Sequence, residues 1–168
     1  MIIGVISDTH MPRSAKRLPS AVIKAFGGVD LILHLGDWVT IDVYEQLAAL
    51  APVEGIAGNN DPGEIIDRFG HRKILTLDTY RIGLVHGHTP FAGRTTEEKA
   101  QLSFKEDRLD AILFGHSHQP LLKQSGGVLL FNPGSAADKR RETRYSVGIL
   151  ELRESGIEAR HIFYDSKE

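Results

Sequence analysis

The chain opens with MIIGVISDTH at residues 1–10, an apolar run that is followed by a short polar segment. The run Ile2–Ser7 is typical of a β-strand that is buried on both faces. Directly after it, Asp8-Thr9-His10 places a carboxylate and an imidazole two positions apart. Ligands of parallel sheets bind outside the carboxyl ends of the strands. We therefore predict a buried strand with chemically active side chains at its end.

The same alternation continues through the first third of the chain. The expected elements are a helix over Ser20–Phe26, a strand over Leu31–Leu35, a helix that begins at Thr40, and a strand over Val53–Ala57. Ser20 and Thr40 are the predicted N-caps, because a hydroxyl oxygen accepts a hydrogen bond from the first turn of a helix. This β-α-β-α-β order is typical of a parallel sheet.

Hairpins outnumber helices in the remainder of the chain. The expected strands are Lys73–Leu77, Arg81–His86, Ala111–Phe114, Leu121–Gln124, Val128–Phe131, Tyr145–Leu152 and Ile157–Tyr164. A capping box at Thr95-Thr96-Glu97-Glu98 predicts a helix that continues to about Arg108. We therefore expect an α/β fold in a single domain over residues 1–168, with two mixed sheets stacked face to face and helices on the outer faces.

Composition excludes several classes of protein. The 168 residues include no Cys, which excludes disulfides, zinc ribbons, thiol catalysis and iron–sulfur clusters. The formal net charge of −2 argues against a nucleic-acid partner or an anionic membrane surface. Neither an apolar run of about 18 residues nor a basic, signal-like N-terminus is present. We expect a cytoplasmic protein with no membrane partner.

Polar loops follow five of the expected strands. They contain Asp8-Thr9-His10, Gly36-Asp37, Gly58-Asn59-Asn60-Asp61, His86-Gly87-His88 and Gly115-His116-Ser117-His118. These loops hold five of the eight His residues of the chain. A Gly-His-x-His motif is expected only about 0.04 times by chance in this composition. The loops are therefore predicted to meet at one site.

The residue types in these loops suit a metal centre. Seven side chains are candidate ligands: Asp8, His10, Asp37, Asn59, His86, His116 and His118. Imidazole and carboxylate groups bind first-row divalent ions such as Mn, Fe, Ni or Zn. Seven ligands are too many for one ion with an open position, but they suit two ions about 3.5–4 Å apart that share a carboxylate.

In their order along the chain, these motifs resemble the calcineurin-like metallophosphoesterase superfamily. Together with Asn132-Pro133-Gly134-Ser135, they are most similar to its small bacterial and archaeal phosphodiesterases. The resemblance implies a four-layer α/β/β/α sandwich and two divalent ions per chain, with Mn expected and Ni, Fe or Zn as alternatives. It assigns Asp8, His10 and His118 to the first ion, Asn59, His86 and His116 to the second, and Asp37 to both.

The resemblance also implies an activity. A bridging hydroxide would attack a small phosphate-ester substrate, which is expected to be a diester. The resemblance further suggests that the chain forms a dimer or a tetramer. Two positions are candidates for catalytic roles. Many members of the family carry a proton-donating His after the Gly-Asn motif, but this chain has Asn60, which supplies no proton. His88 is expected to contact substrate phosphate or to support a ligand, with direct metal binding as the alternative.

Two other classes of function remain open at this stage. A eukaryotic retromer subunit resembles these enzymes in fold but serves as a protein-binding scaffold, and larger relatives are nucleases. The full set of metal-capable side chains favours an enzyme, and the short, slightly acidic chain argues against a nuclease.

Some residues near the motifs have simpler expected roles. We expect His34 to be buried and hydrogen-bonded, Trp38 to belong to the core or to the wall of the site, and Asp61 to orient the Gly-Asn turn. His71 and His161 are expected at the surface. Basic residues near the motifs are expected either to be solvated or to bind an anion: Arg13, Lys16, Arg17 and the 139–144 cluster.

Overall fold

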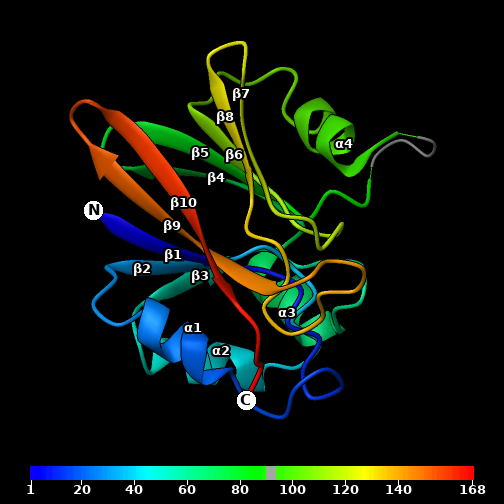
Figure 1. The fold of residues 1–168 in the computed structure, drawn as a ribbon. Helices are drawn as coiled ribbons and strands as arrows, with labels where there is room; N and C mark the ends of the chain where they lie inside the picture. Colours follow the sequence, from blue (N-terminus) through cyan, green and yellow to red (C-terminus); the bar gives the residue numbers. More distant parts are fainter. Residues whose placement is uncertain (90–93) are drawn as a thin grey trace.

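Two five-stranded sheets dominate the structure, a computed structural model that describes residues 1–89 and 94–168 (Figure 1). The first sheet has the order β10-β9-β1-β2-β3. Its strands are β1 (Ile2–Ile6), β2 (Leu31–His34), β3 (Val53–Gly55), β9 (Tyr145–Arg153) and β10 (Gly156–Tyr164). The first three are mutually parallel, and β9 and β10 form an antiparallel hairpin beside β1. The continuous apolar run of β1 therefore lies at the centre of its sheet.

The second sheet has the order β4-β5-β6-β8-β7. Its strands are β4 (Arg72–Leu77), β5 (Tyr80–Val85), β6 (Ala111–Leu113), β7 (Leu121–Ser125) and β8 (Val128–Asn132). The three central strands are parallel, and the hairpin partners β4 and β7 form antiparallel edges. Both sheets are therefore mixed, as the sequence predicted.

Side chains alternate between two cores along each central strand, because successive residues of a strand point to opposite faces. On β1, Val5 packs into the core between the sheets, whereas Ile6 packs toward the helices. Helices α1 (Ser20–Ala25), α2 (Asp42–Ala48) and α3 (Gly63–Phe69) contribute to this second core, and α4 (Thr96–Leu102) covers the second sheet. Figure 1 shows α1 and α2 outside the first sheet and α4 outside the second. The predicted α/β/β/α order of layers is confirmed.

Helix α3 was not predicted from the sequence. It is only seven residues long and follows the turn-forming segment around Pro62, which hides its start. Its apolar signal consists of Ile65 and Phe69, four residues apart, and both are buried against the first sheet. Such a short pattern is too brief to distinguish from a loop by periodicity.

Helix boundaries differ from prediction at three places. Thr95 caps α4 by accepting the Glu98 N–H at 3.1 Å, as predicted, but the helix ends at Leu102 and not at about Arg108. Ser20 is the first residue of α1, and Pro19 occupies the cap position without a side-chain hydrogen bond; the Ser20 hydroxyl donates to the carbonyl of Glu168. Thr40 precedes α2 by two residues and accepts the Asp42 N–H at 3.4 Å.

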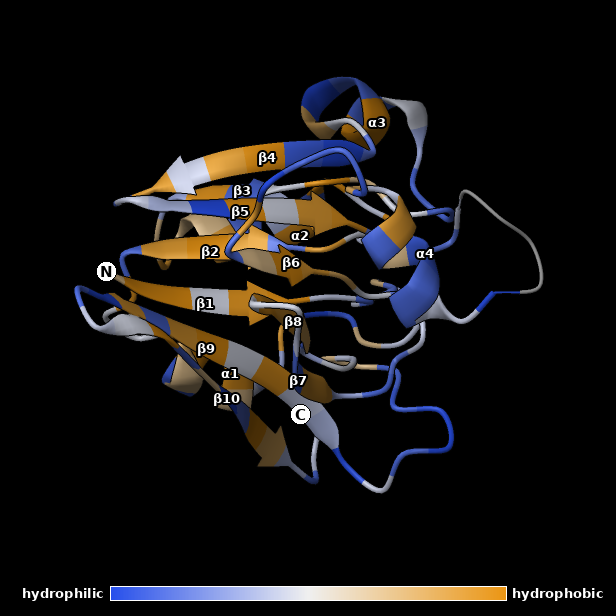
Figure 2. Ribbon diagram, turned by 90° about the horizontal axis from the view of Figure 1, so that it is seen from above, coloured by the Kyte–Doolittle hydropathy of each residue, from blue (hydrophilic) through white to orange (hydrophobic). Residues whose placement is uncertain are grey.

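The carboxyl ends of the parallel strands lead into polar loops. Figure 2 shows apolar colour along the strands and polar colour along many of the loops that join them.

Within residues 1–89 and 94–168, no helix combines the length and apolar character needed to cross a membrane.

Candidate metal centre

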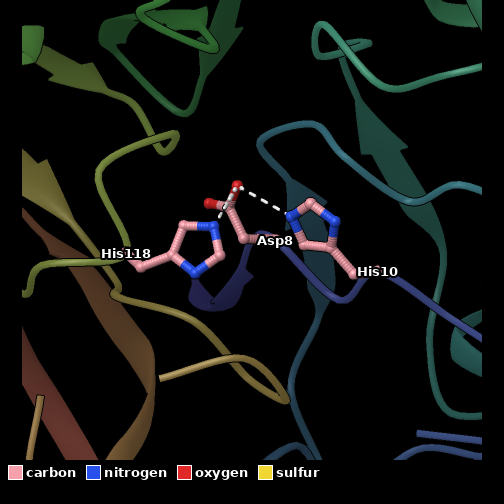
Figure 3. Close-up of side chains that lie close together, drawn as sticks. All are labelled: Asp8, His10 and His118. Atoms are coloured by element: carbon pink, nitrogen blue, oxygen red, sulfur yellow. Dashed lines mark ion pairs between the residues drawn. The ribbon is translucent and has the colours of Figure 1, made fainter. Parts of the chain in front are cut away.

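Two buried clusters of carboxylate and imidazole groups lie at the carboxyl ends of β1, β2, β5 and β6. The first contains Asp8, His10 and His118, and the second contains Asp37, His86 and His116. Within each cluster one ligand atom of every residue lies within 4.8 Å of the others. Figure 3 shows the first cluster, in which Nε2 of His10 lies 3.7 Å and Nε2 of His118 lies 3.4 Å from Oδ1 of Asp8.

Asp37 joins the two clusters. Its Oδ2 atom lies 3.4 Å from Nε2 of His10 in the first cluster and 3.3 Å from Nε2 of His86 in the second. Nε2 of His86 also lies 3.8 Å from Oδ1 of Asp8. The two clusters are therefore one continuous site, and the Asp37 carboxylate stands where a shared ligand is needed.

Four buried atoms that face the centre of this site lack a hydrogen-bond partner among the described residues. Among the described residues, these buried atoms include Oδ1 of Asp8 and Nε2 of His10, His86 and His118. Buried polar atoms in proteins are nearly always paired, and four convergent exceptions need an explanation. Divalent ions bound between these oxygen and nitrogen atoms would satisfy all four. The arrangement therefore fits a binuclear divalent metal site.

Hydrogen bonds on the far side of three predicted ligands, His86, His118 and Asp8, fix their orientation. Nδ1 of His86 donates to the Leu35 carbonyl at 2.7 Å, and Nδ1 of His118 donates to the Asp138 carbonyl. Oδ2 of Asp8 accepts the Ser7 hydroxyl at 2.6 Å and the His116 N–H at 3.0 Å. Each of these bonds leaves the opposite atom of the ligand directed into the site, as outer hydrogen bonds do in metal centres.

The backbone at the ligands is strained. Asp8, His10, Asp37, His116 and His118 have φ values between 44° and 69°, in the left-handed region that residues other than glycine rarely adopt. Eight residues other than glycine have a positive φ in the described part of the chain, and five of them are predicted ligands. Such strain concentrates at functional sites, where the surrounding contacts must hold it in place.

The site favours positive charge. Burial alone would raise the pKa of Asp8, but the nearby imidazole of His86, together with His10 and His118, holds that pKa well below its usual range. Burial likewise opposes ionisation of Asp37, yet contacts with His86 lower its pKa to about 2. For His86 the carboxylates outweigh burial and raise the pKa to about 9. Two ionised carboxylates in a buried site attract a cation.

The two asparagines after β3 differ in their contacts. Asn59 is exposed, and among the described residues its side chain makes no hydrogen bond, so its role as a ligand stays a prediction. Asn60 instead donates its backbone N–H to Oδ1 of Asp37 and its side-chain amide to Oδ2, both at 2.9 Å. The sequence did not indicate that Asn60 would hold the shared carboxylate.

His88 lies beside the second cluster but outside it. Its ring centroid is 5.5 Å from that of His86 and 6.2 Å from that of His116. Burial, followed by the neighbouring imidazoles, lowers its pKa to about 4. Its Nδ1 atom is buried and has no partner among the described residues. The predicted catalytic role of His88 stays a prediction.

The expected structural role of His34 is confirmed. Its Nδ1 atom accepts the Gly36 N–H at 3.1 Å, and Nε2 lies 3.1 Å from the Thr9 hydroxyl. Trp38 is fully buried and stacks on His34 with a centroid distance of 3.9 Å, so Trp38 belongs to the core.

His161, which is expected at the surface, is partly exposed but also makes specific contacts. Its ring is half-buried on Phe131, with a centroid distance of 4.6 Å, and Nε2 lies 2.7 Å from the Asn132 carbonyl. His71 is exposed, as predicted, although its Nδ1 atom lies 3.2 Å from the Ala57 carbonyl.

Asn132, the last residue of β8, and Ser135, which follows it, hold the loops that carry predicted ligands. Ser135 donates its hydroxyl to the Asp8 carbonyl at 2.7 Å, and the amide of Asn132 donates to the Gly115 carbonyl at 3.0 Å. In the sequence these residues stand out only as part of the motif Asn132-Pro133-Gly134-Ser135, which does not predict their contacts.

A cleft of about 420 Å³ opens beside the clusters. It is lined by His10 and Asn60 from the site, and by Arg13, Ser14, Asp138 and Arg140 from the loops around it. One predicted ligand, His10, is therefore accessible from this cleft.

Comparisons with known proteins agree with this geometry. The chain is 38% identical over 152 residues to a protein of Methanothermobacter thermautotrophicus named "Probable metallophosphoesterase", covering 90% of this chain and 86% of that protein. It is 29% identical over 154 residues to a phosphodiesterase of Methanocaldococcus jannaschii, covering 80% of this chain and 83% of that protein. The crystal structure of Chaetomium thermophilum Vps29 is similar with a TM-score of 0.77 over 98% of both chains, at 19% identity, which shows a likeness of fold alone.

The match to a family covers nearly the whole chain. The family model described as "Calcineurin-like phosphoesterase superfamily domain" matches residues 1–155, a range that contains every predicted ligand. The chain therefore belongs to the calcineurin-like phosphoesterase superfamily.

Proposed function

We propose that this protein is a phosphodiesterase that uses two divalent ions, with manganese as the first candidate, to hydrolyse a small phosphate diester. The observation that carries the proposal is the position of Asp37, whose carboxylate lies within 3.4 Å of an imidazole nitrogen in each cluster. The phosphodiesterase of M. jannaschii, a distant relative, supports the choice of a diester.

The proposal gives each residue of the site a metal-binding or a positioning role. Asp8, His10 and His118 would hold one ion, His86 and His116 with Asn59 the other, and Asp37 both. Such ions neutralise the charge of phosphate oxygens and lower the pKa of water. Asn60 keeps the Asp37 carboxylate in place through two hydrogen bonds of 2.9 Å.

Protonation of the leaving group is the step that the Asn60 side chain in the cleft does not support. Asn60 lines the cleft, and its amide has no acidic proton to give to a departing alkoxide. His88 lies next to the second cluster, 5.5 Å from His86 between ring centroids, and its buried Nδ1 atom has no partner among the described residues. Diesters with good leaving groups are therefore the preferred substrates.

The proposal is tested by hydrolysis of bis(4-nitrophenyl) phosphate and 4-nitrophenyl phosphate by manganese-loaded protein. We expect faster turnover of the diester, loss of turnover with a chelator, and recovery on adding manganese. Asp8→Asn should abolish most of the activity. Asp67→Asn, an exposed change on α3, is the matched control and should retain it. A preference for the monoester, or turnover that survives the chelator, would contradict the proposal.

A further inference from the structure

Two arginines border the cleft beside the metal centre. Arg13 and Arg140 both line it, and Asp138 is the acidic residue among the lining side chains. Within the described part of the chain, neither guanidinium has a carboxylate oxygen within 4.0 Å. The lining of the cleft therefore contains two arginines and one aspartate and carries more positive than negative charge. The metal centre beside it, by contrast, contains the carboxylates that attract cations.

Neighbouring basic residues have other contacts. Nζ of Lys139 lies 4.9 Å from the centroid of the Tyr145 ring, and the guanidinium of Arg144 lies 4.6 Å from that of Phe163. Such cation–π contacts engage these charges with the protein itself. Arg140 has no such ring contact among the described residues and stays available to a ligand.

Backbone geometry places both arginines at the cleft. Arg140 has a φ of 50°, a left-handed conformation that is unfavourable for a residue with a side chain. Arg13 lies in a tight turn closed by the Ser14 N–H, which donates to the His10 carbonyl at 2.8 Å. This turn restrains the backbone around Arg13, which follows the predicted metal ligand His10 by three positions in the sequence.

The cleft is larger than a single phosphate group requires. Its volume of about 420 Å³ lies in the range of small-molecule sites, about 300–1,000 Å³. Guanidinium groups bind phosphate through two parallel N–H bonds, and the Ser14 hydroxyl adds a further donor on the same wall. These features suit a second, doubly charged phosphate.

We infer that Arg13 and Arg140 form a subsite for a second phosphate group, so that the physiological substrate is a diester that also carries a phosphomonoester. This inference rests on the proposed function, because it assigns the substrate class of the same site. The two arginines contribute specificity: they bind the group that is not cleaved and so orient the diester toward the metal centre.

Two nucleotide esters with the same leaving group test the inference. They are thymidine 5′-(4-nitrophenyl phosphate) and the same compound with a 3′-phosphate. We expect kcat/KM to be about 10- to 100-fold higher for the ester with the 3′-phosphate, as charged hydrogen bonds typically provide. Arg13→Gln and Arg140→Gln should each reduce this ratio about tenfold. Arg17→Gln, an exposed residue of the same loop outside the cleft lining, should leave the ratio unchanged.

A binding experiment tests this inference independently of the proposed function. Chelator-treated protein is titrated with adenosine 3′,5′-bisphosphate and with adenosine 5′-monophosphate, and the bisphosphate should bind about tenfold more tightly in a way that requires both arginines. If neither ester is hydrolysed, the proposed function fails while this titration still decides on the subsite. Equal binding of the two nucleotides, or a ratio of kcat/KM that neither arginine variant changes, would overturn the inference.

Discussion

The carboxylate of Asp61 holds the backbone of Asp37 in place. Oδ2 of Asp61 accepts the Asp37 N–H at 2.8 Å and the Gly58 N–H at 2.7 Å, and Oδ1 accepts the Val39 N–H at 2.7 Å. One side chain therefore ties the loop after β2 to the loop after β3. The sequence predicted that Asp61 would orient its own turn, and the structure extends this role to the shared carboxylate of the metal centre.

Asp61→Ala should weaken both the fold and the site. The substitution leaves three backbone donors without their acceptor, which we expect to lower the free energy of unfolding by about 1–3 kcal/mol. It should also reduce the metal content, because Asp37 loses its support. Urea unfolding and elemental analysis measure the two effects, with Asp67→Ala on the exposed face of α3 as the control. Full stability with full metal content in Asp61→Ala would show that this network is dispensable.

Gly115→Ala should disturb the first cluster specifically. A Cβ atom at Gly115 would lie 2.1 Å from the Ser7 hydroxyl and 2.8 Å from Oδ2 of Asp8. Both side chains must move, so we expect a loss of about 1–3 kcal/mol in stability and a lower affinity for one ion. Gly63→Ala is the matched control, since a Cβ there meets nothing within 4 Å. Metal titrations in which the two variants behave alike would refute this account of Gly115.

Much of the fold and of the site follows from the sequence because both depend on local patterns. The apolar run of β1 and the polar residues after it predicted a central strand and the location of Asp8 and His10. Similar patterns predicted the loops of Asp37, His86 and His116. Parallel strands bring the loops of Asp8 and Asp37 to one edge of the first sheet, and those of His86 and His116 to one edge of the second. The meeting of these two edges depends on how the sheets stack.

The remaining features depend on tertiary contacts. Helix α3 is defined by the burial of Ile65 and Phe69 and not by a repeating pattern. His161 is covered because β10 places it over Phe131, a contact between two sheets. The hydrogen bond from Ser135 to Asp8 joins residues 127 positions apart. A sequence motif identifies such residues only as candidates, because their partners are set by the assembled fold.

His86→Ala and His88→Ala should have different consequences. Nδ1 of His86 is held by the Leu35 carbonyl at 2.7 Å, which directs Nε2 toward Asp37. Its loss should lower the metal content. His88 lies outside both clusters, so His88→Ala should retain the metal and lose turnover by about 10²–10⁴-fold if it moves a proton. Equal metal loss in both variants would make His88 a ligand, and exposed His71 supplies a control substitution nearby.

Asn60→His should change the dependence of the rate on the leaving group. An imidazole at this position can donate a proton, which typically contributes about 10²–10⁴-fold to hydrolysis. We expect little change for nitrophenyl diesters and a gain for alkyl diesters. Because the Asn60 side chain also donates to Asp37 at 2.9 Å, metal content must be measured in parallel. Identical leaving-group dependence in the two proteins, with the metal retained, would show that the proton already comes from another group.

The number of divalent ions bound per chain decides whether the site is binuclear. It is measured by elemental analysis after loading with manganese and removing free ions, in the native chain and in Asp37→Asn, which keeps the size of the side chain. We expect two ions in the native chain and at most one in Asp37→Asn, with hydrolysis reduced by roughly 10²–10³-fold. A native chain that binds fewer than two ions, or an Asp37→Asn variant that keeps both ions and full activity, would contradict this expectation.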